Sequence, residues 1–125
     1  MPGMIMVYGI PNCDSVKKAR TWLALQQLDY QFHDFKKQGV PAARLTQWEE
    51  ALGWATLLNR RGTSWRKLDA ATQATVCDAA SAQTLMLSQP SLIKRPVVEW
   101  GGRITVGFDP QSWSAASAGA GANLE

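Results

Sequence analysis

A short apolar run close to the N-terminus, followed by a loop and a cysteine, constrains the fold more than any other feature of the chain. Residues 5–8 form the run, and the β-branched side chains of Ile5 and Val7 favour a strand. Residues 9–12 (Gly-Ile-Pro-Asn) then break the pattern and predict a loop. Cys13 comes directly after this loop, so the sequence predicts a cysteine in the connection between the first strand and the next element.

A helix is expected after the cysteine. From residue 14 to about residue 27, apolar side chains recur at helical spacing, at Val16, Ala19 and Leu23. Asn12 or Asp14 can cap the first turn of this helix.

A second strand is expected at residues 30–35, where Tyr30, Phe32 and Phe35 are the apolar members and His33 lies between them as a structural residue. Pairing of this strand with the first one completes a β-α-β unit within the first 36 residues.

The other end of the chain predicts a β-hairpin. Two strand-like runs, residues 97–100 and 103–108, are separated by Gly101-Gly102, and glycine supplies the positive φ that a two-residue turn requires. A final helix is expected to start at Asp109-Pro110, and residues 118–125 are expected to form a small-residue, flexible tail.

The region between these two parts is expected to be helical. Pro41 can start a helix that continues toward Leu58, with its apolar face at Leu45, Trp48, Leu52 and Ala55. A short turn is expected around Trp65. One or two further helices, ended by Pro90, are expected over residues 70–88, with three side chains in the core: Val76, Ala80 and Leu85. We therefore predict one domain, residues 1–125, with a helical insert at approximately 41–90.

Composition excludes several functions. The net charge is +3, but basic residues are dispersed and no basic run alternates with aromatics, so direct nucleic-acid binding is not expected. No apolar run reaches the length of about 18 residues that a membrane span needs, and no secretory signal is recognised, so we expect a cytoplasmic protein. Two cysteines and one histidine are too few for a structural zinc site, so no metal site is expected.

Cys13 is the strongest candidate for chemistry. Free N–H groups and the dipole at the start of a helix stabilise a thiolate. Lys17 can add positive potential, whereas Asp14 opposes it. The alternative is that Cys13 is a small buried apolar side chain. Cys77 is expected to be of that second kind, buried within a helical segment.

Three separate motifs resemble the arsenate-reductase-like (ArsC/Spx) family, closest to its YffB-type branch. They are residues 8–20 (YGIPNCDSVKKAR), 57–62 (LLNRRG) and 93–96 (IKRP), and the resemblance extends over roughly residues 4–117. It implies an α/β, thioredoxin-like fold with a mixed four-stranded sheet and an inserted helical subdomain. It also implies a cis peptide bond at Pro96 and a mechanism in which Cys13 is the nucleophile. By the same resemblance Arg95 contacts the oxyanion or thiol substrate, and Arg60 or Arg61 is its partner.

The chain departs from three related patterns. Residues 106–108 (VGF) stand where glutaredoxin-coupled arsenate reductases carry an arginine before a proline, which argues against arsenate as the substrate. Val16 replaces the second cysteine of the Cys-x-x-Cys switch of Spx-type regulators that bind RNA polymerase. Ala19 replaces the arginine of the Cys-x5-Arg loop of phosphatase-type reductases, so both of those mechanisms are excluded.

Two functions of different classes follow. The first is a glutathione-dependent thiol–disulfide reductase that works through the single thiol of Cys13, with glutathione as co-substrate and no bound cofactor. The second is a non-catalytic, Spx-like module that binds a protein partner such as RNA polymerase. The candidate site residues are Cys13 as the catalytic residue and, for binding glutathione or an anion, Asn12, Lys17, Arg60, Arg61, Arg95 and Pro96.

Overall fold

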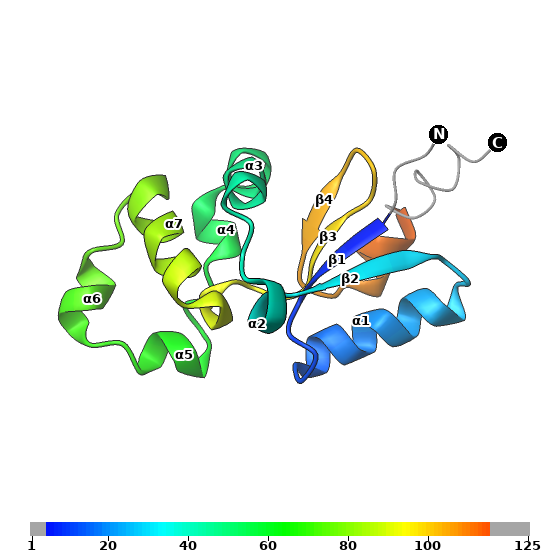
Figure 1. Ribbon diagram of the computed structural model, residues 1–125, viewed down its shortest axis with the longest axis horizontal. Coiled ribbons are helices and arrows are strands. Elements are labelled where there is room, and N and C mark those ends of the chain that lie inside the picture. The colour runs from blue at the N-terminus through cyan, green and yellow to red at the C-terminus, as the bar shows by residue number, and fades with distance from the viewer. Residues whose placement is uncertain (1–4, 116–125) are drawn as a thin grey trace. The chain divides into compact units, whose positions relative to one another are not determined.

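The chain forms two compact units. The computed structural model describes residues 5–115 (Figure 1). One unit combines Met1–Asp34 with Arg95–Glu125, and the other is the continuous segment Phe35–Lys94. The helical segment predicted at approximately 41–90 falls within the second unit. The expected tail at 118–125 lies outside the described residues, and the assignment of the whole chain to one domain stays a prediction.

The first unit, called the sheet unit below, is built on a mixed four-stranded sheet, as expected. The strands are β1 (Ile5–Gly9), β2 (Tyr30–Asp34), β3 (Val97–Glu99) and β4 (Ile104–Val106). Their order is β2-β1-β3-β4. β1 and β2 are parallel, with Gly9 opposite Asp34, whereas the β1–β3 and β3–β4 pairs are antiparallel. The sheet therefore joins the β-α-β unit of the N-terminal part to the C-terminal hairpin.

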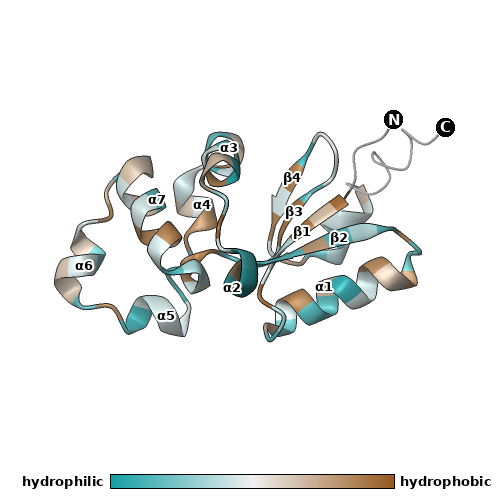
Figure 2. Ribbon diagram, viewed as in Figure 1, coloured by the Kyte–Doolittle hydropathy of each residue, from teal (hydrophilic) through white to brown (hydrophobic). Residues whose placement is uncertain are grey.

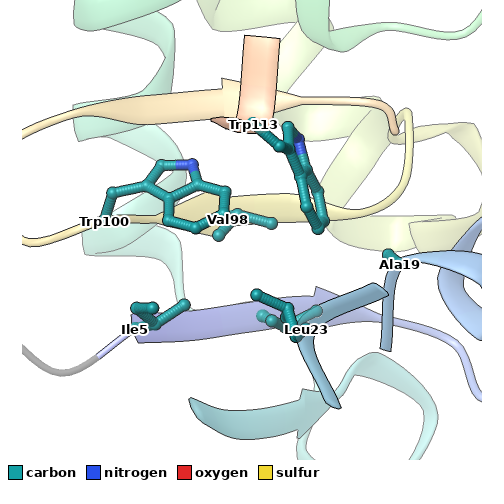
Figure 3. Packing of buried hydrophobic residues seen from close by; sticks show 7 residues of the cluster. Ile5, Ala19, Leu23, Val98, Trp100 and Trp113 are labelled. Carbon is teal, nitrogen blue, oxygen red and sulfur yellow. The ribbon is translucent and has the colours of Figure 1, made fainter. Parts of the chain in front are cut away.

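Helix α1 (Asp14–Leu25) connects the two parallel strands and packs on one face of the sheet. Its polar and apolar residues alternate in Figure 2, and the three residues predicted for its buried face, Val16, Ala19 and Leu23, are all 0% exposed. Ala19 and Leu23 join a cluster with Ile5 of β1 and Val98 of β3 (Figure 3). The helical spacing in the sequence thus identified the correct face.

An aromatic cluster closes the same face of the sheet. Residues 110–115 are helical and place Trp113, which is 0% exposed, beside Trp100 (Figure 3). The Trp113 ring makes edge-to-face contacts with Trp22, Trp100 and Phe108 at centroid distances of 5.6, 5.1 and 5.0 Å. Such edge-to-face pairs add to the free energy gained by burying the rings, so this cluster stabilises the helical residues 110–115 against the sheet.

The predicted turn between β3 and β4 is present. Trp100 donates its backbone N–H to the carbonyl of Arg103 over 2.8 Å, so that residues 101 and 102 form the loop. Gly101 has a φ of 101°, a conformation that side chains other than glycine rarely adopt. This turn explains why the two short runs pair as neighbours.

The second unit, called the helical unit below, contains short helices around its own core. They are α2 (Phe35–Gln38), α3 (Ala42–Leu52), α4 (Trp54–Leu57), α5 (Thr63–Arg66), α6 (Ala70–Ala74), α7 (Ala79–Ser88) and the 3₁₀ turn η1 (Pro90–Leu92). An isolated antiparallel bridge pairs Leu58 with Ile93. Backbone hydrogen bonds on either side of this bridge, from Asn59 to Leu92 and from Lys94 to Leu57, connect two distant parts of the unit.

The helix predicted from Pro41 toward Leu58 is interrupted, which corrects the sequence-based expectation. Gly53 has a φ of 87°, a conformation that cannot continue an α-helix, and it separates α3 from α4. The break changes which side chains face inward: Leu45 and Trp48 are buried, as predicted, whereas Leu52 is half-buried and Ala55 is exposed.

A second correction concerns residues 75–80. Asp78 accepts a hydrogen bond from the Ser81 N–H and begins α7 with a capping box, so Cys77 lies in the loop before this helix and is exposed. The predictions that Cys77 is buried in a helix and that Ala80 is a core residue are therefore wrong. With α7 starting at Ala79, its buried residues are Ala82 and Met86.

Within residues 5–115, no helix has both the length and the apolar character that crossing a membrane requires.

Candidate active site

Cys13 is the N-cap residue of α1. Its backbone is extended (φ −81°, ψ 128°), its N–H donates to the Ile10 carbonyl over 3.1 Å, and its carbonyl accepts from the Lys17 N–H over 2.9 Å. Because the first helical hydrogen bond ends on Cys13, neither Asn12 nor Asp14 is the cap. That part of the sequence-based prediction is wrong, while the position of Cys13 at the helix start is confirmed.

The surroundings of the half-buried Cys13 thiol favour its ionised form. Burial raises the pKa of the thiol, but the Val16 backbone N–H, the hydrogen bond and positive charge of Arg95, and the Ser15 N–H together hold it below its ordinary value. Arg95 and the first helical turn thus share the stabilisation of the thiolate.

The sheet topology explains how Arg95 reaches Cys13. β3 starts two residues after Arg95, and its first residue, Val97, lies opposite Tyr8 near the end of β1. Cys13 follows β1 after a short loop, so the two ends converge on the same edge of the sheet. The Arg95–Pro96 peptide bond is cis, as the family resemblance implies.

The other predicted residues of the sheet unit are more peripheral. Asn12 and Lys17 are exposed. Neither the Lys17 ammonium nor the Asp14 carboxylate is among the groups that shift the pKa of Cys13. The predicted roles of Asn12 and Lys17 in binding glutathione or an anion therefore stay predictions.

Arg60 and Arg61 belong to the helical unit, and both are exposed. The guanidinium carbon of Arg60 lies 5.2 Å from the centre of the Trp54 ring, a cation–π contact. The Arg61 N–H donates to Asn59 Oδ1 over 3.2 Å, and the Arg61 carbonyl accepts from Arg66 Nη2 over 2.7 Å. These contacts order the loop that carries both arginines, while their partnership with Arg95 stays a prediction.

His33 takes part in a packing contact within the sheet unit. Its ring lies 5.1 Å from that of Tyr8, the residue opposite it on β1, and the Tyr8 hydroxyl donates to Glu99 Oε1 over 3.0 Å. The contact agrees with the structural role expected for His33.

The sequence-based prediction missed Ser15 and Val16 as contributors to the site. They act through backbone N–H groups, for which the side-chain sequence holds no signal beyond the expected start of a helix. Among the residues that the structure describes, no group of three or more His, Cys, Asp or Glu side chains is arranged to hold a metal ion.

Comparisons with known proteins agree on one family. The model of the ArsC family matches residues 8–116. An uncharacterised protein of Haemophilus influenzae is 41% identical over 115 residues, which are 92% of this chain and all of that protein. The solved structure of a protein named YFFB is 51% identical, covers 90% of this chain and 98% of its own, and superposes with a TM-score of 0.86. The global transcriptional regulator Spx of Streptococcus pyogenes is 26% identical over 85% of this chain and 79% of its own length.

Proposed function

Because the chain belongs to the ArsC family, we propose that it is a thiol–disulfide reductase in which Cys13 is the nucleophile and glutathione the reductant. The observation that carries this proposal is the position of Cys13 at the start of α1 beside Arg95, where the Val16 N–H, Arg95 and the Ser15 N–H lower the pKa of the thiol. A thiol with a lowered pKa has a larger thiolate fraction near neutral pH, and the thiolate is the nucleophile in disulfide exchange.

The proposed cycle uses one protein thiol. The Cys13 thiolate attacks one sulfur of a substrate disulfide, forming a Cys13 mixed disulfide and releasing the other half as a thiolate that takes up a proton. A glutathione thiolate then attacks the substrate sulfur of this mixed disulfide. The Cys13 thiolate leaves, and the substrate half departs as a disulfide with glutathione. A second glutathione thiolate then attacks this last disulfide, the substrate half leaves as a thiol, and glutathione disulfide forms, so that two glutathione molecules supply the two electrons that reduce the substrate disulfide.

The absence of a second cysteine near Cys13 in the sequence supports this scheme. Val16 occupies the position of the second cysteine in a Cys-x-x-Cys pair, and Cys77 is a free, exposed cysteine in the helical unit. An external thiol such as glutathione is therefore the proposed resolving group, which fits a reaction in the reducing cytoplasm.

The proposed roles of the other residues are binding roles. Arg95 stabilises the thiolate before attack and again when Cys13 leaves, since a guanidinium can donate to sulfur and carry the opposite charge. Asn12 and Lys17 would bind a carboxylate of glutathione, and Arg60 or Arg61 is proposed as an anion-binding residue of the helical unit. We favour a disulfide over arsenate as substrate, because residues 106–108 lack the arginine and proline of arsenate reductases.

The test is glutathione-dependent reduction of a mixed disulfide between glutathione and a small thiol. The matched variants are Cys13→Ser and Cys77→Ser. We expect the parent and Cys77→Ser to turn over at the same rate, and Cys13→Ser to fall to the uncatalysed rate. Mass spectrometry of Cys77→Ser should show one glutathione adduct, on Cys13. Equal rates for Cys13→Ser and the parent would overturn the proposal.

The second candidate is the non-catalytic, Spx-like docking module. The similarity to the transcriptional regulator Spx over 85% of this chain favours it. It predicts binding to purified RNA polymerase that survives Cys13→Ser, together with no turnover by the parent. Turnover that requires Cys13 would decide for the reductase.

A further inference from the structure

Gly9, the last residue of β1, has a close neighbour on α1. A Cβ atom placed on Gly9 would lie 2.7 Å from Cγ2 of Val16 and 3.7 Å from its Cγ1. Such a distance is well inside van der Waals contact, so any larger residue at position 9 must displace something. Gly9 lies in a regular strand and its φ is not positive, so its backbone does not require glycine. Position 9 therefore calls for glycine because Val16 leaves no room for a Cβ atom, and not because of the backbone conformation.

Val16 is poorly able to give way. It is 0% exposed, and as a β-branched residue in a helix it has one strongly preferred rotamer. A rotation that moved Cγ2 away from position 9 would drive a methyl group into the close-packed interior. The easier response to a Cβ on Gly9 is a shift of the helix backbone that carries Val16.

That same backbone carries the N–H groups that act on the thiol. Val16 stands in the first turn of α1, and its N–H is the foremost of the groups that favour the ionised form of Cys13, while the Ser15 N–H adds to it. Cys13 itself is held by its hydrogen bond to the carbonyl of Ile10, the residue after Gly9. A shift of the first turn relative to the strand end would therefore change the distance between these N–H groups and the sulfur.

We propose that Gly9 is a positioning residue for Cys13: the absence of its side chain lets the first turn of α1 approach β1 closely enough to hold the Val16 and Ser15 N–H groups at the sulfur. The role differs from that of Arg95, which acts on the thiol directly. It rests on the proposed function only in taking Cys13 as the reacting thiol.

The test is a double-mutant cycle in the Cys77→Ser background, with the rate of Cys13 alkylation by iodoacetamide measured against pH. The variants are Gly9→Ala, Val16→Ala and the combination of both. We expect Gly9→Ala to slow alkylation about threefold at a fixed pH below the midpoint, as its midpoint moves up. Val16→Ala keeps the N–H and is the reference for the combined variant. The combined variant should have the profile of Val16→Ala, because removing the methyl groups of Val16 makes room for the new Cβ.

The matched control is Gly102→Ala. A Cβ on Gly102 meets no atom within 4 Å and its φ is not positive, so this variant should keep the parent profile. An unchanged profile for Gly9→Ala, or a combined variant as slow as Gly9→Ala, would overturn the proposal. If Gly9→Ala does not fold, the combined variant decides: a profile like that of Val16→Ala supports the proposal, and a slower one contradicts it.

This test separates the positioning role from the proposed function, since alkylation needs neither glutathione nor a disulfide substrate. A parent protein that shows the Gly9–Val16 coupling but no turnover would refute the reductase proposal alone. Turnover without the coupling would refute the positioning role alone.

Discussion

Different interactions stabilise the inside of the sheet unit and the inside of the helical unit. The sheet unit joins segments from both ends of the sequence through strand pairing and a cluster of buried aromatic rings. The helical unit is one continuous segment, in which α2, α4, α5 and α6 have only four or five residues each and side-chain caps begin α6 and α7. The Cys13–Arg95 pair belongs to the first kind of structure. A reactive group whose partner is far away in sequence is thus placed by strand pairing between distant segments of the chain.

The largest loss of stability is expected from removing a buried tryptophan of the sheet unit. We expect Trp113→Ala to lower the free energy of unfolding by about 3–5 kcal/mol, because it empties a site in contact with three other aromatic rings. The control is Trp54→Ala in the helical unit, where the ring is only half-buried, with an expected loss of about 1 kcal/mol. Urea denaturation followed by circular dichroism measures both. Equal losses would mean that the aromatic cluster is not the main stabilising feature of the sheet unit.

The reactivity of Cys13 should depend on an arginine of the sheet unit, Arg95, and not on an arginine of the helical unit, Arg60. In the Cys77→Ser background, Arg95→Gln should slow alkylation of Cys13 about fivefold to tenfold near neutral pH, since it removes a charged donor to the thiolate. Arg60→Gln is the control, because this guanidinium lies over the Trp54 ring and does not contribute to the pKa of Cys13. A slowing by Arg60→Gln as large as that by Arg95→Gln would contradict the assignment of Arg95 as the main charged partner.

The two units also differ in how they accommodate a buried glutamate. Glu99 in the sheet unit and Glu49 in the helical unit are each 8% exposed. Glu99 accepts a hydrogen bond from the Tyr8 hydroxyl, whereas Glu49 Oε2 has no hydrogen-bond partner among the described residues. Burial raises the pKa of Glu49 above its ordinary value.

The pH dependence of stability follows from the direction of this shift. The unfolded chain releases the Glu49 proton at the ordinary pKa and the folded chain only at a higher pH. The stability associated with a protonated Glu49 is therefore fully present below the ordinary pKa and is lost as the pH rises through the raised pKa of the folded chain. Glu49→Gln should remove this decline and gain about 1 kcal/mol at neutral pH, because no charge is then buried. Urea denaturation between pH 4 and 8 measures the difference. Parallel pH profiles for the parent and Glu49→Gln would contradict it.

The same contrast governs how much of the fold could be predicted from the sequence. The short strand-like runs, Gly101-Gly102 and the spacing of Val16, Ala19 and Leu23 predict the sheet unit well, because the runs and the spacing reflect buried regular elements and the two glycines mark a tight turn. The sequence predicts that the helical unit is helical, but it does not predict where the individual helices begin and end. Helices of one turn show too little of the 3.6-residue period for the break at Gly53 or the exposed loop at Cys77 to be recognised.

The candidate site could be predicted only in part, for a related reason. Cys13 is marked by its place between a strand and a helix, and Arg95 by its resemblance to a family motif. The contributions of the Ser15 and Val16 N–H groups depend on backbone positions that residue types do not encode. The close approach of Gly9 to Val16 depends on how α1 packs on β1, and a single glycine at a strand end can equally mark a bulge or a tight bend.

The central claim is that the sheet unit holds Cys13 as an activated thiolate, and its most direct test is the rate of Cys13 alkylation against pH in Cys77→Ser. With only one thiol left, the midpoint of the profile reports the pKa of Cys13. We predict a midpoint clearly below the value of about 8.5 that is usual for a free cysteine. A midpoint at or above that value would contradict the account.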